Sequence, residues 1–254
     1  MTTVLITGCS SGFGLETAKH FLERGWTVVA TMREPRADIL PASERLKVLP
    51  LDVTDAASIA ACLEAAGPVD ALVNNAGVGL LNALEGIPME AARLAFETNT
   101  LGTIAMAKAV LPQFRERKAG VIVNVTSTVT VKPLHLLSVY TASKAAVNAF
   151  SECLALEVEP FGIRVRIVLP GRAPETAFGA NHRKHMAFGI PDAYSEIAEG
   201  VFTEWRTYPA DQVTHTGDVA EAVWRAATDS SCPMRLPAGV DAVAAMEGAE
   251  RVLA

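Results

Sequence analysis

The segment that decides the fold spans residues 7–14 and reads Thr7-Gly8-Cys9-Ser10-Ser11-Gly12-Phe13-Gly14. The apolar run Val4-Leu5-Ile6 comes directly before it, and an amphipathic stretch from Leu15 to Leu22 begins directly behind it. This order predicts a strand, a glycine turn and a helix start. Because glycine has no Cβ atom, the first two glycines can take backbone angles closed to other residues, and the third lets the helix lie close to the sheet. The free N–H groups and the dipole of the helix would then bind a phosphate group at the turn.

A second pattern lies far downstream, in the run Tyr140-Thr141-Ala142-Ser143-Lys144. Residues four apart on a helix share one face, so Tyr140 and Lys144 can point into the same site. Alone, this pair reads as a half-buried tyrosine beside a solvated lysine. Ser127 changes that balance because it ends the apolar run of residues 121–126, which places its hydroxyl at the carboxyl edge of a buried parallel strand. Ligands of open α/β sheets bind at that edge.

These patterns together resemble the classical short-chain dehydrogenase/reductase family over nearly the full chain. The matching pieces are Thr7-Gly8-x-x-x-Gly12-x-Gly14, Asn74-Asn75-Ala76-Gly77, Asn99 after Glu97-Thr98, Ser127, Tyr140-x-x-x-Lys144 and Pro170-Gly171. Each piece is modest alone, but their order and spacing are highly specific. The turn and the run Ala30-Thr31-Met32-Arg33 look most like the hydroxysteroid and retinol dehydrogenase branch. The resemblance implies a Rossmann fold.

Alternating helix and strand periods predict a doubly wound α/β fold, with a parallel, mostly seven-stranded sheet and helices on both faces. We expect strands at residues 3–7, 27–31, 47–51, 71–73, 121–126, 164–169 and 234–236. Helical patterns cover residues 15–24, 56–66, 89–117, 139–159 and 218–228. We interpret residues 1–254 as a single domain. Residues 172–213 do not follow this alternation of helices and strands. By resemblance they form a substrate loop with short helices of its own.

Composition limits the partners and the compartment. A net charge of −6 argues against a nucleic-acid or anionic-membrane partner, since either requires a basic face. The four cysteines are widely separated and no metal-ligand motif is present, so we assign no metal and expect reduced thiols. The run His182-Arg183-Lys184-His185 reads as a solvated helix face.

Residues 1–3 run straight into the first strand and no uncharged stretch spans a bilayer, so we expect a cytoplasmic protein.

The candidate catalytic residues are Ser127, Tyr140, Lys144 and Asn99. Reduction of a carbonyl builds negative charge on its oxygen, so the site needs a proton donor and a hydrogen-bond donor, which Tyr140 and Ser127 supply. We expect the Lys144 ammonium to lower the pKa of the Tyr140 phenol. By resemblance Lys144 also holds the nicotinamide ribose, and Asn99 positions a water that links Lys144 to solvent. The alternative for Asn99 is a capping or packing residue within a helix.

Cofactor choice depends on the end of the second strand. An acidic residue roughly 20 positions beyond the glycine turn accepts hydrogen bonds from the ribose in NAD-binding turns. Met32 takes that place, and Arg33 beside it can pair with a ribose 2′-phosphate, which predicts NADP(H). The alternative is that Arg33 is solvated and both cofactors are accepted. The full set of expected cofactor contacts is Gly8, Ser10, Ser11, Gly12, Phe13, Gly14, Arg33, Asp52, Val53, Asn75, Ala76, Gly77, Tyr140, Lys144, Pro170, Gly171 and Thr176.

The chain departs from the family after Pro170-Gly171. Glu175 occupies the place of the usual threonine, and Thr176 comes one residue later. We interpret this as a one-residue insertion, so the contact to the nicotinamide amide moves to Thr176 or is lost.

We expect an NADPH-dependent carbonyl reductase or alcohol dehydrogenase for apolar or aromatic ketones. The apolar pocket would be lined by Val78, Leu80, Leu81, Phe178, Met186 and Phe188, while His135 is either a pocket or an exposed loop residue. An epimerase or dehydratase of the extended branch is disfavoured by the glycine spacing. The alternative from another class is a cofactor-sensing regulator without turnover. The resemblance also implies a homodimer or homotetramer through residues 89–117 and 139–159.

Overall fold

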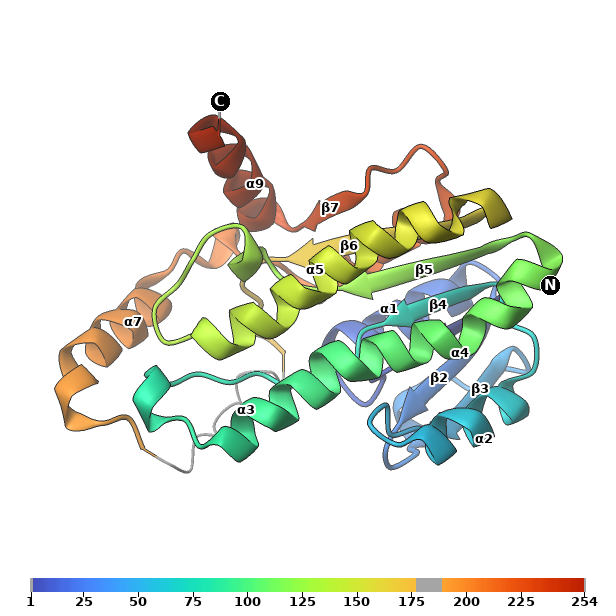
Figure 1. Ribbon diagram of the computed structural model, residues 1–254, viewed down its shortest axis with the longest axis horizontal. Helices are drawn as coiled ribbons and strands as arrows, with labels where there is room; N and C mark the ends of the chain where they lie inside the picture. The colour runs from blue at the N-terminus through green and yellow to red at the C-terminus, as the bar shows by residue number, and fades with distance from the viewer. Residues whose placement is uncertain (1, 177–188, 254) are drawn as a thin grey trace.

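One parallel sheet of seven strands forms the centre of the protein (Figure 1). The computed structural model describes residues 2–176 and 189–253. The strand order is β3-β2-β1-β4-β5-β6-β7. The bounds are β1 Thr3–Ile6, β2 Thr27–Met32, β3 Leu46–Pro50, β4 Ala71–Asn74, β5 Gly120–Val125, β6 Ile163–Pro170 and β7 Arg235–Ala238. The prediction of a doubly wound parallel sheet is thus confirmed, with strand ends within two residues of those expected.

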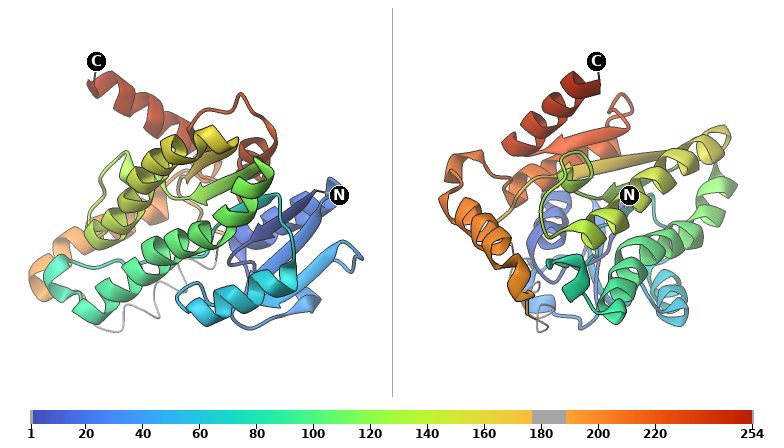
Figure 2. Two further views of the ribbon diagram at one scale, coloured as in Figure 1. Left: turned by 45° about the vertical axis from the view of Figure 1, so that its right-hand side comes forward. Right: turned by 60° about the vertical axis from the view of Figure 1, so that its left-hand side comes forward.

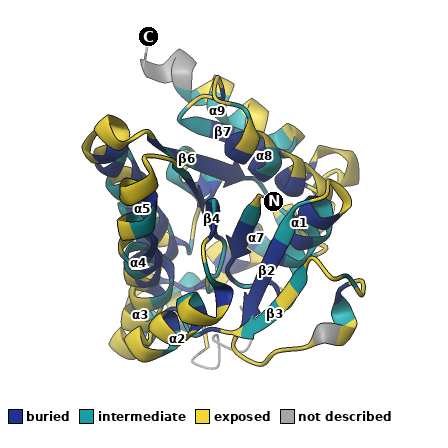
Figure 3. Cartoon of the chain, turned by 90° about the vertical axis from the view of Figure 1, so that its right-hand side faces the viewer, coloured by how far each residue is buried: buried dark blue, intermediate teal, exposed yellow. Residues whose placement is uncertain are grey.

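Helices cover both faces of the sheet, and Figure 3 shows the buried strands between the two layers. Helices α1 and α8 pack together on one face, and α2, α4 and α5 cover the other. Alternate residues of β1 therefore enter different cores: Val4 and Ile6 face the α1–α8 side, and Leu5 faces α2 and α4. The helix bounds are α1 Gly12–Glu23, α2 Ala56–Ala66, α3 Met89–Phe96, α4 Gly102–Arg117, α5 Ser138–Val158, α7 Ser195–Thr207, α8 Thr216–Thr228 and α9 Val240–Leu253.

The strand order reverses next to β1, and open α/β sheets have a crevice at the carboxyl ends of the strands at such a point. Ile6 at the end of β1 is in register with Ala30 of β2 on one side and with Val73 of β4 on the other. The chain leaves these strands at the same edge, where α7 also lies (Figures 1 and 2). Open α/β sheets bind ligands at such a reversal of strand order.

Residues 89–117 are helical as expected, but a π-helical turn divides them into two α-helices. Helix α3 ends at Phe96, a π-helical turn (η3) runs through Glu97–Leu101, and α4 begins at Gly102. A π-helical turn holds one more residue than an α-helical turn, so it changes the direction in which the following side chains point. Asn99 lies in this turn and is completely buried. One extra residue shifts the spacing of the apolar residues only slightly, so the sequence pattern does not reveal the π-helical turn.

A helix within residues 172–213 was expected, whereas the helix after the last strand was not. Helix α7 falls within the expected substrate loop, and α9 follows β7. Within the described ranges, no helix combines the length and the hydrophobicity that crossing a bilayer requires.

Candidate functional site

The glycine turn between β1 and α1 has no room for side chains at two of its glycines. A Cβ atom at Gly8 would lie 2.8 Å from the Ala76 Cα atom, and one at Gly14 would lie 2.3 Å from the Gly8 carbonyl oxygen. Gly8 and Gly12 also have positive φ angles of 74° and 55°, which favour glycine. The turn leads into the first N–H groups of α1 as expected, and this cradle fits the pyrophosphate of a dinucleotide.

The turn after β4 is fastened to the glycine turn by hydrogen bonds. The backbone N–H groups of Asn75 and Ala76 donate to the Thr7 hydroxyl at 3.0 and 2.9 Å. The Asn75 amide donates to the carbonyl oxygens of Thr7 at 2.9 Å and Gly8 at 3.1 Å. The side chain of Asn75 therefore braces the wall of the crevice, and the adjoining Gly77 faces the catalytic candidates.

Ser127 and Tyr140 meet beyond the carboxyl end of β5. Ser127 caps the short helix η4, Thr128–Thr130, and Tyr140 lies in the first turn of α5. Their hydroxyl groups are hydrogen-bonded, and that bond favours the ionised phenol. Burial has the larger effect and raises the pKa of Tyr140 above its ordinary value. The expectation that the Lys144 ammonium lowers the pKa of Tyr140 is therefore wrong, because desolvation raises this pKa and outweighs the hydrogen bond from Ser127.

Lys144 lies one helical turn after Tyr140 and is also buried, with 6 % of its surface exposed. Its ammonium group donates a hydrogen bond to the Val125 carbonyl oxygen at 3.0 Å. Desolvation lowers the pKa of Lys144 from its usual value to about 8. The ammonium is therefore held at the end of β5, in the same part of the crevice as Ser127.

Asn99 is fixed from the π-helical turn by three hydrogen bonds of its side chain. Its amide donates to the Val78 carbonyl oxygen at 2.9 Å and to the Ser143 hydroxyl at 3.0 Å, and its carbonyl oxygen accepts from the Val78 N–H group at 2.8 Å. A Cβ atom at Gly77 would lie 3.1 Å from the Asn99 amide oxygen and 3.4 Å from the Lys144 ammonium nitrogen. The structure therefore brings Asn99 and Lys144 together over Gly77.

The far end of the crevice carries two arginines rather than one. Met32 is 3 % exposed at the end of β2, and Arg33 after it is exposed. Arg36 was missed: its guanidinium donates to the Ser10 carbonyl oxygen at 3.0 Å, so it reaches the glycine turn. The sequence signal that could have identified Arg36 is its position three residues after Arg33.

Asp52 and Val53 follow β3 beside this end of the crevice. The Asp52 carboxylate accepts from the N–H and hydroxyl groups of Thr54 at 2.9 and 2.7 Å, and these bonds lower the pKa of Asp52. Val53 is buried against the start of α4, where a Cβ atom at Gly102 would lie 2.7 Å from a Val53 methyl group. Both residues therefore have local structural roles beside the expected adenine contact.

The segment after Pro170-Gly171 joins the start of α8 to the glycine turn. The Glu175 carboxylate accepts from the Thr216 N–H group at 2.6 Å, at the first turn of α8. The next residue, Thr176, lies against the glycine turn, with its Cβ atom 3.5 Å from where a Gly12 Cβ atom would be. The structure thus places Thr176, and not Glu175, beside the expected cofactor cradle.

An apolar cluster surrounds the ring of Tyr140. Its buried members are Leu80, Leu81, Ile87, Ala95, Val129, Leu137 and Tyr140, and Val78, Phe202 and Trp205 pack against them. Three residues expected in this pocket (Phe178, Met186 and Phe188) and the run His182 to His185 lie outside the described residues. His135 is exposed, as in the surface-loop alternative.

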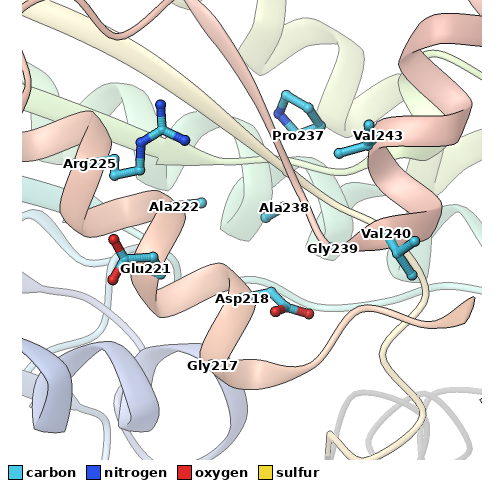
Figure 4. A pocket seen from close by; sticks show the side chains of 10 residues that line it. All are labelled: Gly217, Asp218, Glu221, Ala222, Arg225, Pro237, Ala238, Gly239, Val240 and Val243. Carbon is cyan, nitrogen blue, oxygen red and sulfur yellow. The ribbon is translucent and has the colours of Figure 1, made fainter. Parts of the chain in front are cut away.

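A separate hollow of about 320 Å³ lies between α8 and the β7–α9 corner. Figure 4 shows Asp218, Glu221 and Arg225 of α8 on one side and Val240 and Val243 of α9 on the other. None of the described candidate residues for the cofactor or the reaction lines this hollow. It is therefore distinct from the crevice at the strand ends.

Comparison with known sequences gives relatives of one family. Residues 2–187 match the family described as short chain dehydrogenase. The chain is 41 % identical over 172 residues to a 3-ketodihydrosphingosine reductase of Bacteroides thetaiotaomicron and 42 % identical over 180 residues to retinol dehydrogenase 8 of Homo sapiens. Each match covers 66 % of this chain, but 62 % of the first relative and 58 % of the second.

Solved structures extend the likeness across the whole chain. A short-chain dehydrogenase from Streptomyces avermitilis has a TM-score of 0.83 and 32 % identity, covering 100 % of this chain and 94 % of that one. Serine dehydrogenase with NADP⁺ has a TM-score of 0.76, 29 % identity and 94 % coverage of both chains. A 3-ketoacyl-(acyl-carrier-protein) reductase from Brucella melitensis with NADH has a TM-score of 0.78 and 28 % identity, covering 93 % and 96 %. With the match of residues 2–187 to the family, these likenesses show that the chain belongs to the short chain dehydrogenases, a family of oxidoreductases.

Proposed function

We propose that the protein is an NADPH-dependent carbonyl reductase that transfers hydride between the nicotinamide and an apolar or aromatic ketone or secondary alcohol. One observation carries the proposal: the bonded hydroxyl pair of Ser127 and Tyr140, the buried Lys144 ammonium and the glycine cradle open onto the same sheet edge. A regulator that only binds dinucleotide has no need of a buried proton donor beside an apolar cluster.

The roles of the residues follow from the charge that the reaction builds. NADPH, when bound, would supply the hydride. The Ser127 hydroxyl would donate a hydrogen bond to the carbonyl oxygen, and Tyr140 would give it a proton. Because burial keeps Tyr140 protonated, the phenol is in the form that reduction requires. Lys144 would favour ionisation of Tyr140 as the proton leaves and would hold the ribose, while Asn99 keeps Gly77 and Val78 in place.

We propose the preference for NADPH from the residues expected beside the adenosine half of the cofactor. NADP⁺ and NADH each occur in a related structure, so family membership alone does not decide the cofactor. Met32 offers no carboxylate to the ribose hydroxyls, whereas Arg33 and Arg36 bring two guanidinium groups to this end. A 2′-phosphate would be stabilised there by charge-assisted hydrogen bonds.

We propose further that the chain is one domain and works in the cytoplasm as a homodimer or homotetramer. Leu94, Leu101 and Leu156 expose 42 %, 49 % and 74 % of their surface on the α3–α5 layer. Such apolar side chains on neighbouring helices favour contact with a second copy. A sizing column tests this, with Leu156→Glu expected to shift the protein to the monomer.

The reductase proposal is tested by following NADPH oxidation with a panel of aryl ketones. Turnover that increases with ketone concentration and saturates supports the reductase. Tight NADPH binding without turnover of any ketone would support the regulator instead.

A further inference from the structure

Asn82 lies in the connection between β4 and α3, and only 1 % of its surface is exposed. Its amide nitrogen donates to the Gly189 carbonyl oxygen at 2.8 Å and to the Gly86 carbonyl oxygen at 3.4 Å. Its backbone N–H group donates to the Leu136 carbonyl oxygen at 2.9 Å. One buried residue thus joins three segments: its own connection, the connection between β5 and α5, and the segment that leads into α7.

The segment that accepts from the Asn82 backbone has an unusual conformation. Leu136 has a φ angle of 63°, a left-handed conformation that is unfavourable for a residue with a side chain. Such a conformation persists only where the surroundings fix it. The next residue, Leu137, is buried in the apolar cluster with Tyr140. The bond from Asn82 therefore helps to hold the residues that precede Tyr140.

The segment that accepts from the Asn82 side chain leads to the other wall of the cluster. Gly86 packs so closely there that a Cβ atom on it would lie 2.7 Å from the Pro191 ring. Helix α7 begins at Ser195 and lies beside this connection (Figures 1 and 2). Its residues Phe202 and Trp205 pack against the cluster around Tyr140. The Asn82 amide therefore fixes the base of α7 relative to that cluster.

We propose that Asn82 is a positioning residue that sets the spacing between the two apolar walls beside Tyr140, and so determines which ketones fit. The proposal rests on the reductase function for its consequence, because the walls must contact the ketone substituents. We propose no contact between Asn82 and the reacting atoms. Its two side-chain contacts are both carbonyl oxygens, so a donor at this position is required.

Two variants and a control test the proposal on the full chain. Asn82→Leu keeps the number and branching of the side-chain heavy atoms but has no donor, and Asn82→Asp has a carboxyl group that donates only when it is protonated. The control is Val223→Ala, which removes two buried methyl groups from α8, in the core on the α1–α8 face. Each protein is measured for hydrogen exchange, for dissociation of NADPH, and for kcat and KM with a bulky aryl ketone and a small alkyl ketone.

We expect Asn82→Leu to speed amide hydrogen exchange in residues 195–207 and to raise KM for the aryl ketone at least about fivefold, because the Gly189 carbonyl oxygen loses its partner. The small ketone's kcat and the dissociation constant of NADPH should not change. In Asn82→Asp, KM for the aryl ketone should rise with pH as the side chain loses its proton. Val223→Ala should lose stability without these changes.

Unchanged exchange in both Asn82 variants would overturn the proposal, as would faster exchange with an unchanged KM for the aryl ketone. If Asn82→Leu does not fold, the pH dependence of Asn82→Asp decides. A wild-type protein that turns over no ketone would overturn the reductase function, and the exchange measurement would still decide whether Asn82 holds the two walls.

Discussion

The Lys144 ammonium donates a hydrogen bond to the Val125 carbonyl oxygen, and this contact places a buried charge at the end of β5. Desolvation lowers the pKa of Lys144 to about 8, from an ordinary value of about 10.4. The unfolded chain therefore binds more protons than the folded chain between these two pH values. The free energy of unfolding should rise with pH in this window, because the cost of the buried charge disappears as Lys144 is deprotonated.

Lys144→Met should remove this rise. Urea unfolding of both proteins at pH 7.5, 8.5 and 9.5 measures the difference between their slopes. An equal slope in the two proteins would show that Lys144 titrates normally. The difference between the two proteins isolates the contribution of Lys144 from that of the other ionisable groups.

Ser127→Ala should reduce kcat by about a hundred- to a thousandfold, the range observed for the loss of one donor to a developing oxyanion. Binding of NADPH should be unchanged, because the hydroxyl faces Tyr140. Ser138→Ala is a matched control, since Ser138 is an exposed serine at the start of the same helix as Tyr140. Steady-state kinetics and cofactor titration measure the two effects. If kcat falls by less than about tenfold, Ser127 does not take part in the reaction.

Cofactor choice is tested at the end of β2. Arg33→Ala should weaken NADPH by the contribution of one charged hydrogen bond, roughly 1.5 to 3 kcal/mol or about ten- to more than hundredfold, with NADH almost unaffected. Met32→Asp should favour NADH and disfavour NADPH, because a carboxylate accepts from ribose hydroxyls and repels a 2′-phosphate. Titration with 2′,5′-ADP and 5′-AMP separates binding from turnover. If Arg33→Ala weakens the binding of NADH and NADPH equally, Arg33 does not select NADPH and the proposed preference for NADP(H) is wrong.

The segment after Pro170-Gly171 is tested by Glu175→Gln. Hydrogen bonds, chiefly from the Thr216 N–H group, lower the pKa of Glu175, so its stabilising contribution is present above the ordinary value of about 4.3 and is lost as pH falls through the lowered value. At neutral pH, Glu175→Gln should therefore lower the melting temperature and weaken NADPH binding, because Thr176 loses its support beside Gly12. Thr176→Ala should weaken binding without the change in stability. Identical NADPH affinity in both variants and in the wild type would show that this segment does not hold the cofactor.

Much of the fold and the candidate site could be predicted because the deciding contacts are local or periodic. The glycine spacing and the four-residue spacing of Tyr140 and Lys144 follow from backbone geometry alone. The interruption at Asn99 could not be predicted, because a π-helical turn depends on tertiary contacts to Val78 and Ser143. The sign of the pKa shift of Tyr140 also failed, since burial is not visible in a sequence.

The residues missed by the sequence analysis act through contacts between distant segments. Arg36 reaches Ser10 across 26 positions, and Asn82 reaches Gly189 across 107. Neither belongs to a motif with a fixed spacing, so only the folded chain shows them.

We propose that Tyr140 gives the proton in ketone reduction, and the variant Tyr140→Phe removes the group that would give it. The change removes one hydroxyl group and little volume from a buried position, so the variant should fold and bind NADPH as the wild type does. Single-turnover oxidation of NADPH with a saturating aryl ketone should then fall by more than a hundredfold, which is at least the contribution of a positioned general acid. A Tyr140→Phe variant that keeps more than about a tenth of the wild-type rate would show that Tyr140 is not the proton donor.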